Sequence, residues 1–200
     1  MKKLKRIFSA LLIGAMALTL LVGCGGSGGS TGSSVQYMDE SSAILNSFID
    51  SSKGWAANGN IEIIGNEALR SLTEKWAGDA SLVLDRLCNP DAWEDEDSFG
   101  PIYLKRPFEY RCENILIEDG ILNDDSRMDV NIQVIEANNV SKDQLNAVLT
   151  GWLTDQEHIG SDQNYTPSDA ALHVYLATSP TNENQKAWVV FLVVAGPFNT

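Results

Sequence analysis

The chain has few of the residues on which most enzyme sites are built. Its 200 residues include only two histidines and three cysteines. The pattern GxSxG occurs only within the Gly/Ser/Thr tract of residues 25–34, which is not the strand-to-helix context of a nucleophile elbow, and no P-loop or HExxH signature is present. The motifs therefore do not indicate a common nucleophile, P-loop nucleotide site or zinc protease. No CxxC pair or cluster of cysteine and histidine is present either, which excludes the usual zinc sites. The residue types therefore do not point to a common class of enzyme.

Basic residues are also scarce. The chain has 14 lysines and arginines against 27 acidic residues, a net charge of −13. Four of the cations and none of the acids lie in the first 23 residues, so the remainder has ten basic against 27 acidic residues, or −17. A protein that binds phosphate backbones needs clustered lysine and arginine. We therefore expect no nucleic-acid partner and no direct adhesion to anionic lipid, and we interpret the charge as a well-solvated surface.

The first residues have the pattern of an export signal. A basic start is followed by an apolar run over residues 7–22, shorter than the roughly 20 residues of a membrane span. The run ends in Leu21-Val22-Gly23-Cys24, which resembles a bacterial lipobox with Cys24 as the lipidated residue. An ordinary secretory signal with a chance cysteine is the alternative. Residues 1–23 are thus predicted to be a lipoprotein signal peptide.

A flexible tether follows the cysteine. Residues 25–34 are all Gly, Ser or Thr and span roughly 17–19 Å as a random coil. A diacylglyceryl group on Cys24 would supply the two chains that stable anchoring requires. We predict a lipidated cysteine and linker at 24–36 and one domain at 37–200. The membrane, reached through the lipid anchor at Cys24, is then a partner, and the domain lies on the extracytoplasmic face of a bacterial cell membrane.

The other two cysteines form a candidate disulfide. Cys88 and Cys112 are an even number in an exported chain. A bridge between them would close a loop of about 25 residues and stabilise the fold by about 3.5 kcal/mol on the chain-entropy model. Two free buried cysteines are the alternative.

Hydrophobic periodicity predicts three helices, over residues 37–52, 66–86 and 141–154. Asn66 is placed to cap the second helix, and Ser141 with Gln144 has the spacing of a capping box. In the third helix one apolar stripe runs from Leu145 to Leu153 and includes Trp152. Each helix therefore has one face to bury.

The later part of the chain predicts strands. Residues 130–134 and 170–178 alternate between apolar and polar, and 188–194 is apolar throughout, as in a strand covered on both faces. The last two form a predicted hairpin. Helices early and strands late, with one strand buried on both sides, predict an α+β fold with three layers, an α-β-α sandwich.

The segment between the second helix and these strands gives the weakest pattern. Residues 91–97, DAWEDED, lack the alternating ligands and glycine of a calcium loop, so we interpret them as a solvated acidic loop. Residues 99–108 contain prolines and aromatics and are predicted to be irregular. A short strand is predicted near Leu116 and Ile117.

The order of these segments resembles the CAP superfamily of SCP-like extracellular proteins, which includes cysteine-rich secretory, antigen 5 and pathogenesis-related proteins. Cys112-Glu113-Asn114-Ile115 stands where bacterial members carry Gly-Glu-Asn-Ile. Residues 151–158, GWLTDQEH, stand for Ala-Trp-x-x-Ser-x-x-His, and 188–194 resemble the closing strand. The resemblance implies a sandwich of CAP type.

One departure from the family concerns the metal. Family members with a full site hold a divalent metal between two histidines, the first in a His-x-x-Pro context. Here that stretch is Leu87-Cys88-Asn89-Pro90, with leucine at the place of histidine. We therefore predict a degenerate member without the two-histidine metal site and without a resident cofactor.

The resemblance implies a cleft formed by Glu113, His158, Asp155 and Asn114. We expect Glu113 and His158 to meet there, since a carboxylate orients an imidazole and raises its pKa. Such a pair could bind a divalent metal weakly, or it could be a purely structural hydrogen bond. Residues 116–137 form a longer segment than usual and are placed to cover the cleft.

The sequence thus predicts a membrane-anchored extracellular domain that binds a small molecule, a lipid or a cell-envelope component near Glu113 and His158, without catalysis. A divalent-metal-dependent hydrolase that uses the same cleft is the alternative. A passive surface module without a ligand site is a third reading. Titration with zinc would separate the hydrolase from the other two readings. Tight zinc binding that is lost in His158→Ala would favour the hydrolase.

Overall fold

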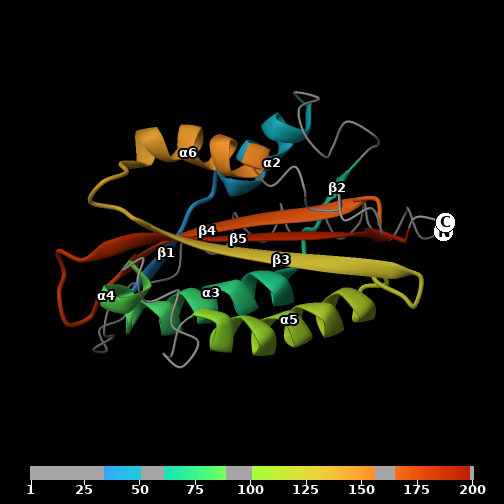
Figure 1. The fold of residues 1–200 in the computed structure, drawn as a ribbon, viewed down its shortest axis with the longest axis horizontal. Coiled ribbons are helices and arrows are strands. Elements are labelled where there is room, and N and C mark those ends of the chain that lie inside the picture. The colour runs from blue at the N-terminus through green and yellow to red at the C-terminus, as the bar shows by residue number, and fades with distance from the viewer. Residues whose placement is uncertain (1–33, 51–60, 89–100, 156–164, 199–200) are drawn as a thin grey trace, which may run out of the picture. The chain divides into compact units, whose positions relative to one another are not determined.

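The fold is a five-stranded sheet with helices on both faces (Figure 1). This computed structural model describes residues 34–50, 61–88, 101–155 and 165–198. The strands are β1 (Val35–Tyr37), β2 (Glu62–Ile63), β3 (Ser126–Glu136), β4 (Asp169–Thr178) and β5 (Lys186–Pro197). The helices are α2 (Ser41–Asp50), α3 (Glu67–Ser81), α4 (Leu84–Leu87), α5 (Pro101–Glu118) and α6 (Lys142–Asp155). The predicted α+β class is confirmed.

The strand order is β1-β4-β5-β3, with β2 paired in parallel to the start of β4 and every other pair antiparallel. β4 and β5 form the predicted hairpin, in register from Asp169↔Ala195 to Thr178↔Lys186. β3 pairs with β5 along all 11 of its residues without a bulge, and it is the last strand of the sheet. The hairpin is therefore central, and β3 forms a long edge.

Two hydrophobic cores lie on opposite faces of the sheet. Alternate side chains of β5 enter each core, and every residue from Trp188 to Val194 is buried, as predicted for a strand covered on both sides. One core packs Phe191 and its face of the sheet against α3, α4 and α5. The other packs Leu192 and its face against α2 and α6. Figure 1 shows these two helical layers below and above the sheet.

The predicted starts of two helices are confirmed. The Asn66 side chain accepts a hydrogen bond of 2.9 Å from the backbone N–H of Leu69 at the start of α3. The Ser141 N–H donates to the Gln144 side chain over 3.1 Å just before α6. The first helix starts later than predicted, at Ser41, because residues 35–37 form β1 beside β4. Val35 and Gln36, which were predicted to be linker, are thus part of the sheet.

The prediction for residues 101–117 is wrong, and residues 99 and 100 lie outside the described ranges. An irregular segment and a short strand were expected, but residues 101–118 form the single helix α5. Pro101 is at the first helical position, where a missing N–H costs nothing, and only Pro107 removes a helical hydrogen bond. Burial of Phe108, Cys112 and Leu116, which are spaced four residues apart, offsets that loss.

α5 ends at a glycine. Gly120 has φ +70°, and its N–H donates to the Ile117 carbonyl over 2.9 Å. This left-handed residue reverses the chain toward β3, as at many helix C-termini. Within the described ranges, no helix combines the length and the apolarity that a membrane crossing requires.

Candidate functional site

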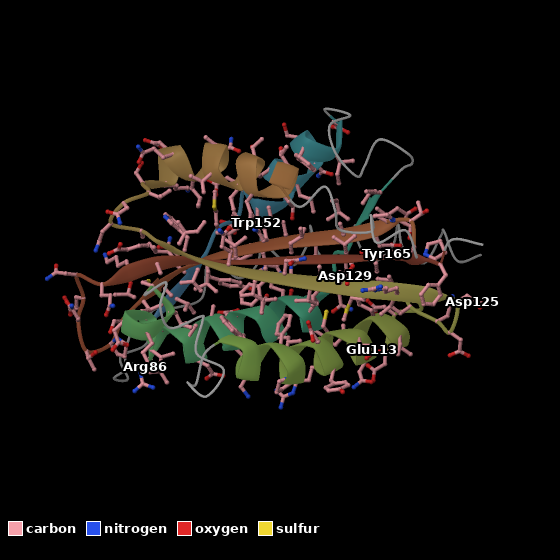
Figure 2. All side chains as sticks on the ribbon, viewed as in Figure 1. Arg86, Glu113, Asp125, Asp129, Trp152 and Tyr165 are labelled. Carbon is pink, nitrogen blue, oxygen red and sulfur yellow. The ribbon has the colours of Figure 1, made fainter. Side chains whose placement is uncertain are left out.

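The structure separates the residues predicted to share a cleft. Glu113 and Asn114 lie on α5 with exposed side chains, rather than after a strand. α5 covers one face of the sheet, whereas Asp155 is the last residue of α6 on the other face. Figure 2 shows Glu113 in the α5 layer and Trp152 beneath α6, on opposite sides of the sheet. Glu113 and Asp155 are therefore not brought together, and His158 lies outside the described residues.

The two cysteines are free thiols in the structure, so the predicted Cys88–Cys112 bridge is not formed. Cys112 is fully buried under α5, and burial, with Glu109 and Glu113 nearby, raises the pKa of its thiol to about 12. Cys88 is half-buried, and burial also raises its thiol pKa. Cys112 thus serves as a small core residue. Cys24, the predicted lipidation site, lies outside the described residues.

A groove of about 210 Å³ opens between α3 and α5. Its apolar floor and walls are formed by Leu72, Trp76, Pro107 and Phe108. Trp76 and Phe108 rest on Phe191 of β5, with ring centroids 5.3 and 5.4 Å from its ring. The floor is therefore fixed to the central strand and does not depend on mobile side chains.

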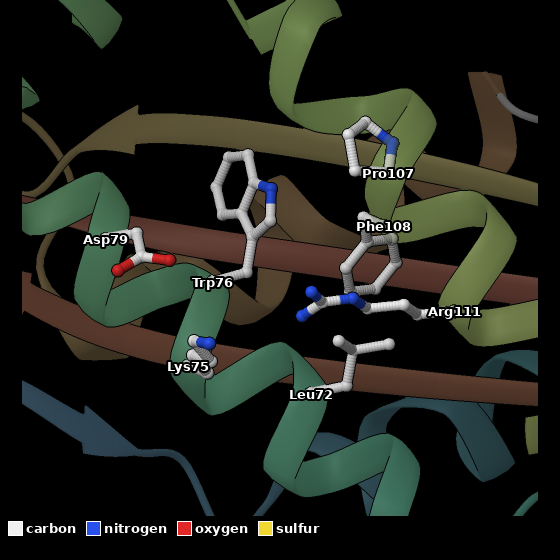
Figure 3. A pocket seen from close by; sticks show the side chains of 7 residues that line it. All are labelled: Leu72, Lys75, Trp76, Asp79, Pro107, Phe108 and Arg111. Carbon is white, nitrogen blue, oxygen red and sulfur yellow. The ribbon is translucent and has the colours of Figure 1, made fainter.

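Charged side chains border this groove. Figure 3 shows the Arg111 side chain reaching from α5 toward α3, where Lys75 and Asp79 stand one turn apart. All three are exposed. In the described part of the chain none of them forms an ion pair, so both cations are available to a ligand.

The chemistry of the groove suits an anionic group on an apolar stem. A guanidinium binds a carboxylate or phosphate through two parallel hydrogen bonds, and the Lys75 ammonium adds a second positive charge. An alkyl or aromatic stem could lie on the floor between Trp76 and Phe108. Sequence reasoning missed Lys75 and Arg111 because the groove exists only once residues 101–118 are recognised as a helix.

A polar cluster is buried on the same face of the sheet, between α3 and β4. The Thr73 hydroxyl oxygen lies 2.9 Å from Nδ1 of His173 and 2.8 Å from the Tyr175 hydroxyl. Burial, with the Arg70 charge nearby, lowers the pKa of His173 to about 4. The Arg70 guanidinium in turn lies 4.4 Å from the centre of the Tyr37 ring. These groups join α3 to the sheet, and His173 is neutral near pH 7.

Another polar contact ties the start of the β4 segment to the edge strand. The Tyr165 hydroxyl donates to the Asp129 carboxylate over 2.8 Å, and a nitrogen of Arg127 lies 3.3 Å from the other carboxylate oxygen. Burial and the Asp129 carboxylate raise the pKa of Tyr165. Tyr165 is almost fully buried, so the contact is a structural link between β3 and the chain entering β4.

No group of three or more His, Cys, Asp or Glu side chains in the described ranges is arranged to hold a metal ion. Comparison of the chain with family models, with curated proteins and with solved structures found no match.

Proposed function

We propose that this chain is a lipid-anchored extracytoplasmic domain that binds, without converting it, a small anionic amphiphile in the groove between α3 and α5. The anionic head would be held by Arg111 and Lys75, and the apolar stem would rest on Trp76 and Phe108. The observation that carries the proposal is the convergence of two cations without ion pairs, among the described residues, on a rigid apolar floor.

The surroundings of the groove restrict the class of ligand. The part of the chain after residue 23 has a net charge of −17, so the groove is a small positive site on an acidic protein. A polyanion would be repelled by the rest of the surface, whereas a ligand with one or two negative charges meets two cations, Lys75 and Arg111, against one carboxylate, Asp79, at the groove. A fatty acid or an anionic lysophospholipid has this chemistry.

The first residues of the sequence support the proposed lipid anchor at Cys24. A basic start, a short apolar run and Leu21-Val22-Gly23-Cys24 have the order of a lipoprotein signal. The Gly/Ser segment after Cys24 would let the groove reach molecules near the outer face of the membrane. A tethered domain at that place meets amphiphiles that leave or enter the bilayer.

A CAP type remains our proposal for the family. It is supported by the succession of α2, α3 and the tryptophan-bearing α6 before the closing hairpin β4–β5, all in a three-layer sandwich. The Glu113-Asn114-Ile115 segment departs from the expected pattern, since it lies within a helix. For this reason we place the ligand in the groove and not beside Glu113.

Calorimetric titration with decanoate tests the proposal. The domain from Ser34 to Thr200 is the suitable material, because every residue of both core clusters lies within it. We expect saturable binding of decanoate, weaker binding of acetate, which lacks the stem, and no binding of decylammonium, which has the opposite charge. Arg111→Gln should weaken decanoate binding by about tenfold or more, since a charge-assisted hydrogen bond contributes about 1.5–3 kcal/mol.

Arg86→Gln is the matched control. Arg86 is an exposed arginine on α4 outside the groove, so its replacement makes the same change in net charge. Equal weakening by both variants would mean that decanoate senses only the overall charge. Equal binding of decanoate and decylammonium would mean that the groove does not select an anion, and either result would refute the proposal.

A further inference from the structure

The edge strand β3 lacks the features with which proteins usually protect a sheet edge. It has 11 residues, no proline and no bulge. Its charged residues, Arg127, Asp129 and Glu136, lie toward its two ends. The central run from Val130 to Ile135, VNIQVI, is uncharged and rich in β-branched residues. Natural edges are normally short, bulged, charged or covered, because an open edge can pair with another strand.

The outer side of this edge is open among the described residues. β3 is at the end of the strand order, and its only described partner is β5. In an antiparallel ladder successive residues direct their backbone N–H and C=O groups alternately to either side. About half of the residues of β3 therefore present these groups away from β5, as a template for a further strand.

We propose that β3 pairs with β3 of a second copy of this chain, antiparallel about a two-fold axis at Asn131, so that the two sheets become one. A two-fold axis perpendicular to the sheet keeps each face of the sheet on its own side. Residues that stand opposite each other must therefore point to the same face, and residues on one face of β3 are all even-numbered or all odd-numbered. The numbers of opposite residues must thus add up to an even number, as they do in the register centred on Asn131.

This register is self-complementary on both faces. On the face toward α5, Val130 stands opposite Ile132, and Met128 opposite Val134. Val130 is already buried and the other three are half-buried, so their apolar side chains extend the core of each copy. On the other face Asn131 meets its own copy, and two amides can exchange hydrogen bonds. No pair of like charges stands directly opposite.

Asp129 and Gln133 give the register its specificity. They stand opposite each other between the two copies, and an amide can donate to a carboxylate. The Gln133 side-chain oxygen is buried and has no hydrogen-bond partner in the described part of its own chain. In the paired register, Arg127 and Asn131 of the second copy are its diagonal neighbours, and both carry N–H donors. Pairing thus offers a donor to a group that lacks one in the single chain.

Disulfide trapping of the full chain in detergent tests both the pairing and its register. Opposite Cα atoms in an antiparallel pair are about 4.5–5.5 Å apart, which a disulfide can span. We expect Asn131→Cys to form a covalent dimer on mild oxidation, well above the unaltered chain with its native cysteines. Asp129→Cys and Gln133→Cys should each cross-link poorly alone and well when the two variants are mixed.

Asn146→Cys is the matched control, an exposed asparagine on α6 away from the edge, and it should give only the background of the unaltered chain. If Asn131→Cys gave no more covalent dimer than Asn146→Cys, the proposal would be overturned. Efficient cross-linking of Asp129→Cys by itself would overturn the register. A positive result with these variants does not depend on the groove, so it stands or fails separately from ligand binding.

A second measurement leaves the cysteines unchanged. Asn131→Lys places two like charges opposite each other on the axis, whereas Asn146→Lys makes the same replacement on α6. By sedimentation of the full chain in detergent, we expect Asn131→Lys to be monomeric at concentrations where the unaltered chain and Asn146→Lys are dimeric. A monomeric unaltered chain, or a dimer that persists in Asn131→Lys, would refute pairing through β3.

Discussion

Thr73 and His173 are joined by a hydrogen bond of 2.9 Å that links the middle of α3 to the middle of β4. The same hydroxyl oxygen lies 2.8 Å from the Tyr175 hydroxyl and 2.8 Å from the Arg70 carbonyl, to which it donates. A hydroxyl has one proton, so when that proton is given to the carbonyl, Nδ1 of His173 must be the donor to Thr73. One buried threonine thus satisfies His173 and contacts Tyr175, whose hydroxyl also donates to the Arg70 carbonyl over 3.0 Å.

Replacement of this threonine by valine should destabilise the fold. Thr73→Val keeps the shape of the side chain but leaves Nδ1 of His173 without its partner in a buried position, whereas the Tyr175 hydroxyl keeps the Arg70 carbonyl as its acceptor over 3.0 Å. We expect the free energy of unfolding to fall by about 1–3 kcal/mol, the cost of an unsatisfied buried polar group. Urea denaturation followed by circular dichroism measures this change.

Thr150→Val is the control for that replacement. Thr150 is exposed on α6, and its hydroxyl also donates to a carbonyl of its own helix, that of Asn146. Its replacement should change stability by less than about 0.5 kcal/mol. Equal effects of the two variants would show that the contacts of Thr73 across to β4 contribute nothing.

The lowered pKa of His173 predicts that the fold loses stability in mild acid. Its pKa is about 4 in the folded chain against 6.5 for an ordinary histidine, because burial disfavours the imidazolium. Between these values the unfolded chain binds a proton that the folded chain does not. Stability is therefore fully present above the ordinary value and falls as the pH decreases toward about 4. At about pH 4.5 this one group should account for about 2–3 kcal/mol relative to about pH 7.

Comparison with His173→Gln isolates this contribution from that of the carboxylates. Glutamine keeps a polar atom near Thr73 but does not titrate in this range. We expect the unaltered chain to lose more stability than His173→Gln between about pH 7 and pH 4.5, measured by urea denaturation at each pH. Parallel pH profiles for the two proteins would contradict a neutral buried His173.

The elements with a clear period were predictable from sequence. α3, α6 and the hairpin were found because their apolar residues recur at helical or strand spacing, and because Asn66 and Ser141 mark two helix starts. The burial of β5 on both faces followed from an apolar run in which no position is polar. β1 was missed, because three residues after a Gly/Ser tract carry too little pattern.

α5 was not predictable by the same means. Two prolines within seven residues favour irregular chain, and only the packed core shows that burial of Phe108, Cys112 and Leu116 outweighs Pro107. The error extended to the site, since Arg111 borders the groove only from a helix beside α3. The expected meeting of Glu113 and His158 stays a prediction, although Glu113 lies on the face of the sheet opposite α6.

Gly196 is the position where β5 comes closest to another part of the backbone. A Cβ atom built there would lie 1.9 Å from the carbonyl oxygen of Thr166 and 2.7 Å from its carbon. The close approach is held by backbone hydrogen bonds on either side, from Thr166 to Pro197 over 2.9 Å and from Ser168 to Ala195 over 2.8 Å. The segment that leads into β4 therefore rests directly on this glycine.

Gly196→Ala should consequently destabilise the fold, whereas Gly151→Ala should stabilise it. At Gly196 the added methyl must push a bonded backbone segment aside, which we expect to cost about 2–4 kcal/mol. Gly151 lies within α6 with nothing near its Cβ position, so alanine should add about 0.5–1 kcal/mol by lowering the entropy of the unfolded chain. Thermal denaturation of both variants should shift the midpoint in opposite directions. A Gly196→Ala protein as stable as the unaltered chain would mean that the Thr166 segment is free to move away from β5.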